Sequence, residues 1–360
     1  MIRLKDIARQ AGVSVAVASK VLNDSRTNVR VGEELRRKIL KIAKQMGYRP
    51  NPLARALAKG KTYSVGIVFS YPPHLFLRDP SASQIVAGVW DKVSKAGYNI
   101  FLKSNKGKKL GYFPSIEDLK GRVDGVIAIG PVRADDEEVA KWNEFEIPVI
   151  LIGNHPGFKG STVDVDNEKG GYLATKHLLS LGHRRIGLIT ISPQQSFVRE
   201  RYLGFIRALK EAGIEAKKDW IEIAEIGDEG GYEAMMRLLS STEPPSAVFV
   251  SAGVCARGAL QAIRAVGLDV PKDISFVAFD RFMENFPQEL SITTVEWSFY
   301  KLGLLSASVL LRLMQGTLKG PVRRRLSVKL VIGASTDKPK ETKKKGGEKR
   351  CCGKRFGPGC

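Results

Sequence analysis

Strand-like apolar runs alternate with amphipathic stretches through most of this 360-residue chain, and that alternation limits the fold more than any other feature. Seven runs rich in Val, Ile and Phe are typical of buried strands and lie at residues 64–70, 98–104, 123–130, 148–153, 185–190, 247–252 and 274–279. Helical periodicity predicts helices at residues 83–96, 116–121, 135–143, 168–181, 199–212, 229–240, 255–266 and 299–315. Strands alternating with helices predict an α/β fold with parallel sheets, and there are more units than one sheet needs.

The first fifty residues have a different, all-helical pattern. Residues 4–11 place apolar side chains on one helical face, Gly12 suits a helix end, and Ser14 can cap the next helix. Residues 15–23 and about 33–46 repeat an apolar face. Two short helices joined by a three-residue turn with glycine predict a helix-turn-helix unit, with a small helical bundle of no further function as the alternative.

Positive charge is concentrated at the two ends of the chain. The formal net charge is +21, of which residues 1–61 carry +11 and residues 338–360 carry +7, whereas residues 62–337 carry only +3. A basic segment attached to a nearly neutral body indicates a polyanionic partner, most simply nucleic acid.

Several classes of protein are disfavoured by the sequence. No run approaches the ~18 apolar residues of a membrane span, and the start has no apolar signal region. Cys255 is alone in the body, and the other three cysteines, in the tail, form no CxxC motif. This usage fits a reducing compartment, so we expect a cytoplasmic protein without disulfides.

Signatures of catalysis are also missing. GxGxxG is absent, and Gly60-Lys61-Thr62 resembles the end of a phosphate loop but has Arg55 where the leading glycine should stand. The four histidines have no metal-binding spacing, and no nucleophile elbow occurs. We therefore expect no enzyme, no cofactor and no metal.

Longer segments resemble a known family. Residues 4–23 and 48–68, followed by residues 165–189, 201–214, 262–280 and 292–295, are similar in order and spacing to the lactose/galactose repressor family of bacterial transcription regulators. The resemblance covers residues 2–336. It implies a helix-turn-helix head, a hinge helix and a two-lobed core like that of periplasmic sugar-binding proteins.

The resemblance implies that the start of the second helix enters the major groove of DNA. Val15, Ala16 and Lys20 would then face the bases. The two small apolar residues could read only thymine methyl groups or shape, and lysine lacks the bidentate fork of the arginine usual there. Val17 stands where the family usually has a phosphate-contacting threonine. Further expected DNA contacts are Ser14, Asn23, Arg55 and Leu57.

Residues 50–61 correspond to the hinge of the family. A helix over residues 53–58 is too short to be stable alone in water, and in the family it folds only on DNA. Leu57 matches the leucine that wedges into the minor groove. The alternative is that Leu57 packs between domains.

The cleft between the two lobes holds a small effector in the family. By position, Asn154, Arg201, Phe249 and Asp280 would contact it, although Arg201 could instead form an interlobe salt bridge and Asp280 a strand-end cap. The family's Asn-Asp pair is replaced by Ala252-Gly253, and Pro131 fills another position where small polar residues are usual. We therefore expect no tight binding of neutral hexoses, while Arg201 could still hold an anionic ligand.

These expectations combine into one interpretation. We predict a head at residues 1–49, a hinge at 50–61, a two-lobed core at 62–336 and a basic, disordered tail at 337–360. The protein would be a homodimeric repressor that binds a pseudo-palindromic operator in double-stranded DNA and responds to a small effector, such as a carbohydrate. Two alternatives stay open: a regulator whose core responds to a protein partner or to nothing, and a small-molecule binding protein with a vestigial head.

Overall fold

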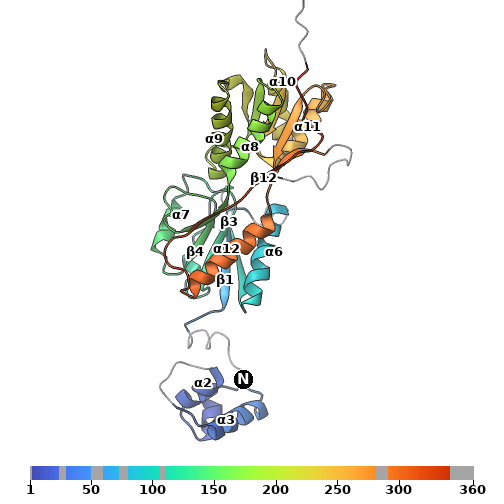
Figure 1. Cartoon of the computed structure of the whole chain (residues 1–360). Coiled ribbons are helices and arrows are strands. Elements are labelled where there is room, and N and C mark those ends of the chain that lie inside the picture. Colours follow the sequence, from blue (N-terminus) through green and yellow to red (C-terminus); the bar gives the residue numbers. More distant parts are fainter. Residues whose placement is uncertain are drawn as a thin grey trace, which may run out of the picture.

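The computed structural model describes residues 2–23, 30–49, 60–72, 80–105, 110–280 and 291–340, and it begins with a three-helix head (Figure 1). The head consists of α1 (Leu4–Ala11), α2 (Val15–Asn23) and α3 (Glu33–Gln45). Gly12 ends α1 with a φ of 70°, a left-handed conformation that glycine adopts without strain. The helices bury a small apolar core, which contains Ile7, Ala11, Val21, Ile39 and Ala43.

The first lobe of the core is built on a six-stranded sheet, β11-β5-β4-β3-β1-β2, in which all neighbours are parallel. Its strands are β1 (Ser64–Phe69), β2 (Asn99–Ser104), β3 (Gly125–Ile129), β4 (Val149–Ile152), β5 (Ser161–Val165) and β11 (Arg323–Leu326). The helices are α6 (Pro80–Lys95), α7 (Glu137–Lys141) and α12 (Phe299–Met314), with short 3-10 turns at Glu117–Leu119 and Trp142–Glu144. Gly88 lets α6 approach α12, because a Cβ there would collide with the Tyr300 carbonyl.

The second lobe repeats this plan with the strand order β12-β10-β9-β8-β6-β7. Its strands are β6 (Ile186–Thr190), β7 (Ile221–Ile223), β8 (Ala247–Val250), β9 (Ser275–Phe279), β10 (Thr293–Glu296) and β12 (Lys329–Val331). The helices are α8 (Asn167–Ser180), α9 (Ser196–Glu211), α10 (Asp228–Leu239) and α11 (Ala256–Ala265), with 3-10 turns at Lys218–Trp220 and Gly253–Cys255. The β10–β12 pair is antiparallel, where the sequence predicted only parallel neighbours.

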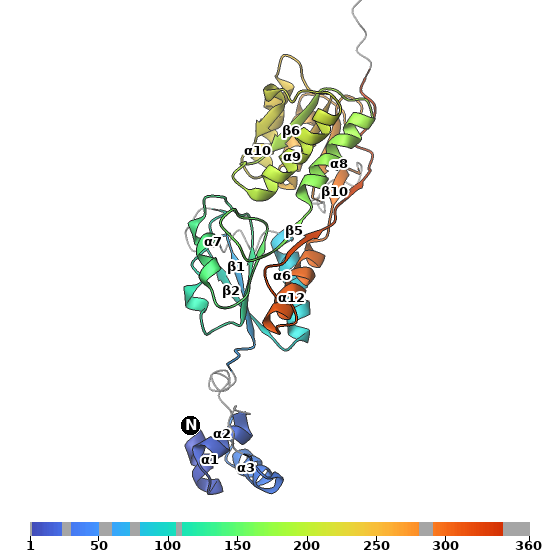
Figure 2. The ribbon, with the colours of Figure 1, turned by 60° about the vertical axis from the view of Figure 1, so that its left-hand side comes forward.

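The chain passes between the lobes three times (Figure 2). It crosses from β5 into α8, returns from β10 into α12, and crosses again from β11 into β12. Each lobe is therefore assembled from separate parts of the sequence. No helix of the residues that the structure describes is long and apolar enough to span a membrane.

All seven predicted strands are present, as β1, β2, β3, β4, β6, β8 and β9. The other five strands have weaker sequence signals. β5 alternates buried and partly exposed residues, β11 reads Arg-Arg-Arg-Leu, and β7 and β12 have three residues each. β10 contains three of the four residues of segment 292–295. That segment resembles the repressor family, but the sequence did not predict a strand there.

The segment after β12 is held against the second lobe by buried His183. Its Nε2 lies 2.8 Å from the Asp337 carbonyl oxygen, and its Nδ1 lies 2.8 Å from the Ser246 hydroxyl. A carbonyl only accepts, so Nε2 carries a proton, and in the neutral ring Nδ1 accepts from the Ser246 hydroxyl, at a shorter distance than the 3.3 Å from that hydroxyl to the Arg185 carbonyl. Lys340 pairs with Asp273. The first residues of the predicted tail, up to Lys340, therefore contact the second lobe, and the rest of the tail lies outside the described residues.

Burial lowers the pKa of His183, so this ring contributes to stability in its neutral form. A base whose folded pKa lies below its unfolded value of 6.5 stabilises above pH 6.5, and the stabilisation is lost as the pH falls. We predict that His183→Gln flattens the loss of core stability between pH 7 and pH 5. The slope should fall by up to about 1.4 kcal/mol per pH unit, the value for one proton.

Urea denaturation followed by tryptophan fluorescence measures this slope. The four tryptophans all lie in the lobes, so their signal reports the core alone. Lys218→Gln is the control, because Lys218 lies on an exposed turn of the second lobe and a lysine does not change its charge between pH 5 and pH 7. An unchanged slope in the His183 variant would contradict the assignment of a neutral ring.

Candidate functional site

The start of α2 is exposed on the head. Val15 keeps 49% of its surface accessible, and Ala16 is also exposed. Ser14 caps the helix, because its Oγ accepts the Val17 amide at 3.3 Å. Val17 itself packs against the core of the head. The outer face of α2 therefore presents small apolar side chains, with the partly buried Lys20 one turn further on.

Exposed cations lie on α1 and α3, the two helices that pack against α2. Among the described residues of the head, no lysine or arginine forms an ion pair. The exposed ones include Lys5, Arg9, Arg36, Arg37, Lys38, Lys41, Lys44 and Arg49. The side chain of Asn23, and all of Arg55 and Leu57, lie outside the described residues, so their predicted DNA contacts stay predictions. A basic surface without internal partners suits a phosphate backbone.

A cavity of about 210 Å³ lies between the two lobes of the core. The first lobe contributes the carboxyl ends of its strands together with α6 and α12, and the second contributes the starts of α8 and α9. This is the usual position for a ligand in open α/β sheets, outside the carboxyl ends of the strands. The predicted residues Arg201 and Asp280 both line it.

Arg201 and Asp280 form a buried ion pair, with Nη1 and Oδ2 3.1 Å apart. Arg201 also donates to Asn167 Oδ1 at 2.9 Å and to the Ser251 carbonyl at 2.6 Å, and its guanidinium stacks on Phe279. Burial lowers its pKa, although the neighbouring carboxylates oppose that shift. Both partners belong to the second lobe, so this pair is not the interlobe bridge that the sequence left open.

Asp280 has its second carboxylate oxygen occupied as well. Its Oδ1 accepts the Trp297 indole N–H at 2.6 Å, while the Asp280 backbone donates to the Val295 carbonyl. Its φ of 71° lies in the left-handed region, which aspartate enters more readily than most residues. The carboxylate is thus fixed at the end of β9 by contacts from β10 and α9.

Asp164 also lines the cavity, and sequence reasoning missed it. Its Oδ1 accepts the Val165 amide at 2.7 Å and the Asn167 side-chain amide at 3.2 Å. Desolvation raises the pKa of Asp164 to about 7, and the nearby Glu200 adds to the shift. In the sequence, Asp164 is an aspartate between Val163 and Val165. It was overlooked because this segment, β5, was not predicted to be a strand.

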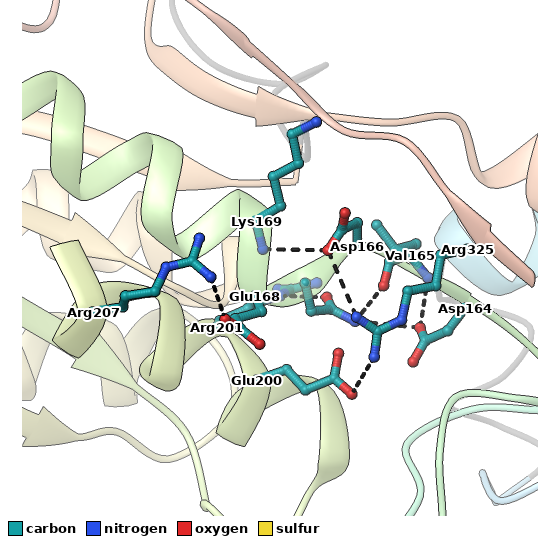
Figure 3. A network of polar contacts seen from close by, with 10 residues as sticks. Asp164, Val165, Asp166, Glu168, Lys169, Glu200, Arg201, Arg207 and Arg325 are labelled. Atoms are coloured by element: carbon teal, nitrogen blue, oxygen red, sulfur yellow. Dashed lines mark hydrogen bonds and ion pairs between the residues drawn. The ribbon is translucent and has the colours of Figure 1, made fainter.

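An ion-pair network spans the crossing between the lobes (Figure 3). Arg325 of β11 reaches Glu200 of α9 at 3.4 Å and Asp166, the N-cap of α8, at 3.7 Å. Burial raises the pKa of Glu200, while Arg325 lowers it. One arginine of the first lobe therefore holds two acids of the second.

The lobes also touch through their backbones beside the cavity. Ser196 donates its amide to the Val132 carbonyl at 3.2 Å, and Ala134 donates to the Gln194 carbonyl at 3.1 Å. Ser196 is the first residue of α9, so a carbonyl of the first lobe accepts one of the amides that a helix start leaves free. These bonds hold the two lobes together at the rim of the cavity.

The other two predicted effector residues lie outside the cavity wall. Asn154 is exposed, and its amide meets the Ser196 hydroxyl at 3.4 Å. Phe249 is fully buried in the core of the second lobe. Ala252, Gly253 and Pro131, the positions where the sequence departs from the family, do line the cavity.

Comparisons with known proteins agree with this geometry. Residues 3–51 match the model of the bacterial regulatory proteins of the lacI family, and residues 175–336 match a periplasmic binding protein-like domain. The HTH-type transcriptional repressor PurR of Mannheimia succiniciproducens is 32% identical over 305 residues, which cover 84% of this chain and 89% of that protein.

Two solved structures extend the likeness to the whole fold. The lac repressor dimer bound to operator and the anti-inducer ONPF is 26% identical, with a TM-score of 0.75, and the match covers 93% of this chain and 99% of that one. The complex of the transcriptional regulator CelR with cellobiose is 28% identical, with a TM-score of 0.69, covering 93% and 100%. This chain therefore belongs to the lacI family of bacterial regulatory proteins, and it is a DNA-binding transcriptional repressor.

Proposed function

We propose that this repressor binds a pseudo-palindromic operator as a homodimer, and that a small molecule in the interlobe cavity changes its affinity for DNA. The observation that carries the DNA-binding half is the exposed start of α2 beside cations that have no partner within the described head. The domain division is residues 1–49 for the head, 50–61 for the hinge and 62–336 for the core. Because a bacterial repressor acts on chromosomal DNA, a cytoplasmic location is part of this proposal.

Three side chains of α2 would read the bases. Val15 and Ala16 are exposed and can contact thymine methyl groups, while Lys20 supplies the one long donor. Leu57 would enter the minor groove from the hinge, as the resemblance implies. Base recognition therefore rests on shape and apolar contact more than on hydrogen bonds.

The cavity favours a core that responds to a small molecule over one that responds to a protein partner or to nothing. It is lined by residues of both lobes, so its contents contact both. A ligand that binds one arrangement of the lobes better than another shifts the population between them, and DNA affinity changes by the same coupling. The complex of the related regulator CelR with cellobiose supports a small molecule as the effector of this core.

Exposed apolar side chains on the first lobe offer a surface for the second protomer. Phe101 and Leu102 lie on β2, the edge strand of the sheet, and Trp90 lies on the neighbouring α6. Trp90 keeps 59% of its surface accessible and Leu102 51%. Exposed edge strands and apolar patches invite association, so we place the dimer contact here.

Lys20 tests the proposed base readout. Lys20→Ala should relax discrimination at one base pair by about 1–3 kcal/mol, because the only long donor at the bases is removed. The measurement is fluorescence anisotropy on an operator selected from random DNA and on its single-base variants. Lys218→Ala, on an exposed turn of the second lobe, is the control. Equal weakening on every sequence would instead make Lys20 a phosphate contact.

Leu102 tests the proposed dimer. Leu102→Asp should convert the protein to monomers in light scattering, because a charge would be buried in the interface, and operator affinity should fall with it. Ile332→Asp is the matched control, since Ile332 keeps 67% of its surface accessible but lies on the second lobe, just after β12. Dimers that persist in the Leu102 variant would rule out this surface.

A further inference from the structure

Most of the cavity wall is apolar. Both lobes contribute aliphatic and aromatic side chains, among them Ile129, Ile152, Ile191, Phe197, Ile226, Trp297 and Phe299. Ala252 and Gly253 add no polar side chain. A molecule that is polar on every side would lose its hydration here without gaining partners, at about 1–3 kcal/mol for each unmatched group.

The charged groups in the wall disfavour an anion. Arg201 lies 3.1 Å from Asp280, so its positive charge is already neutralised. Among the described lining residues, Asp164 adds a second carboxyl group, which is charged above its pKa of about 7, and no second cation accompanies it. An anionic ligand would face the Asp280 carboxylate, the Asp164 carboxyl group and one guanidinium that is already paired, which argues against our expectation that Arg201 holds an anion.

Two acceptors in the wall lack donors. The Oε1 atom of Gln195 is buried and has no hydrogen-bond partner. Both hydrogen bonds of Asp164 fall on Oδ1, which leaves Oδ2 without a donor among the described residues. The buried, unpaired oxygen of Gln195 costs about 1–3 kcal/mol, and a ligand that donates to it would recover that free energy.

We propose that the effector is a small molecule with an apolar, ring-sized body and a hydrogen-bond-donating head, either hydroxyl or protonated amine, that binds at Asp164 and Gln195. This inference rests on the proposed function, because it assumes that the interlobe cavity is the effector site. The cavity, at about 210 Å³, is below the ~300–1,000 Å³ of drug-sized pockets and suits a small ligand.

A series of ligands with one body and different heads tests the proposal on the full-length protein. Phenethyl alcohol carries a hydroxyl, phenethylamine an ammonium and hydrocinnamate a carboxylate, while glucose and glucose 6-phosphate lack the apolar body. We expect the alcohol or the amine to raise the melting temperature, because bound ligand stabilises by mass action. Comparing the alcohol with the amine identifies which head group the protein binds. Hydrocinnamate and both sugars should leave the melting temperature unchanged.

Asp164→Asn tests the assigned contact. The amide oxygen can still accept from Val165 and Asn167, so the local hydrogen bonds are retained while the charge is lost. We expect phenethylamine to bind about tenfold more weakly or worse, which corresponds to the loss of a charge-assisted hydrogen bond. Gln195→Met, of similar size, should weaken both donor ligands. Asp219→Asn makes the same chemical change on an exposed turn outside the cavity and should change nothing.

The outcomes separate the two proposals. Stabilisation by hydrocinnamate or glucose 6-phosphate, without stabilisation by the donor ligands, overturns the inference and leaves the effector site in place. Equal affinity of the donor ligands for the wild type and for both variants also overturns it. If no compound stabilises the protein, the inference fails, whereas the effector half of the proposed function fails only if a broad set of small molecules also leaves the melting temperature unchanged. Operator binding, measured separately, still tests the DNA-binding half.

Discussion

The guanidinium of Arg201 joins four parts of the second lobe that are far apart in the sequence. It projects from α9 and contacts Asn167 at the start of α8, the Ser251 carbonyl after β8 and Asp280 after β9. Removing one charge of such a buried pair leaves the other without its partner, at a cost of about 3–5 kcal/mol. The face of the second lobe that closes the cavity therefore depends on this one side chain.

The contacts between the lobes are weaker by comparison. Arg325 is half exposed, and ion pairs of that kind contribute about 0–1 kcal/mol. The backbone bonds from Ser196 and Ala134 can be replaced by bonds to water when the lobes separate. The second lobe is rigid, and only modest contacts join it to the first lobe. The two lobes can therefore adopt two relative arrangements, and a ligand needs only a few kcal/mol of differential affinity to shift the population between them.

The sequence predicted the strands that contain a run of Val, Ile, Leu or Phe, even the largely exposed β2, and it missed the strands that lack such a run, even the mostly buried β10. All seven predicted strands lie in the sheets, but β5 and β11 were missed because their residues alternate or are charged. Missing β5 also hid Asp164. Arg201 and Asp280 were found through the family resemblance, yet no sequence pattern indicates that they neutralise each other, because that pairing depends on the packing of α9 against the end of β9.

The three chain crossings also govern how the protein is made. The sheet of the first lobe ends in β11, at Arg323–Leu326, although its other five strands are complete by Val165. During synthesis on the ribosome, the first lobe therefore cannot be completed until most of the second lobe has been made, because its edge strand and α12 come later in the sequence. Domains that are contiguous in sequence can fold one after another during synthesis, whereas these two lobes must finish almost together. A chain that stops before β11 would leave β5 as an open sheet edge, which is a template for aggregation.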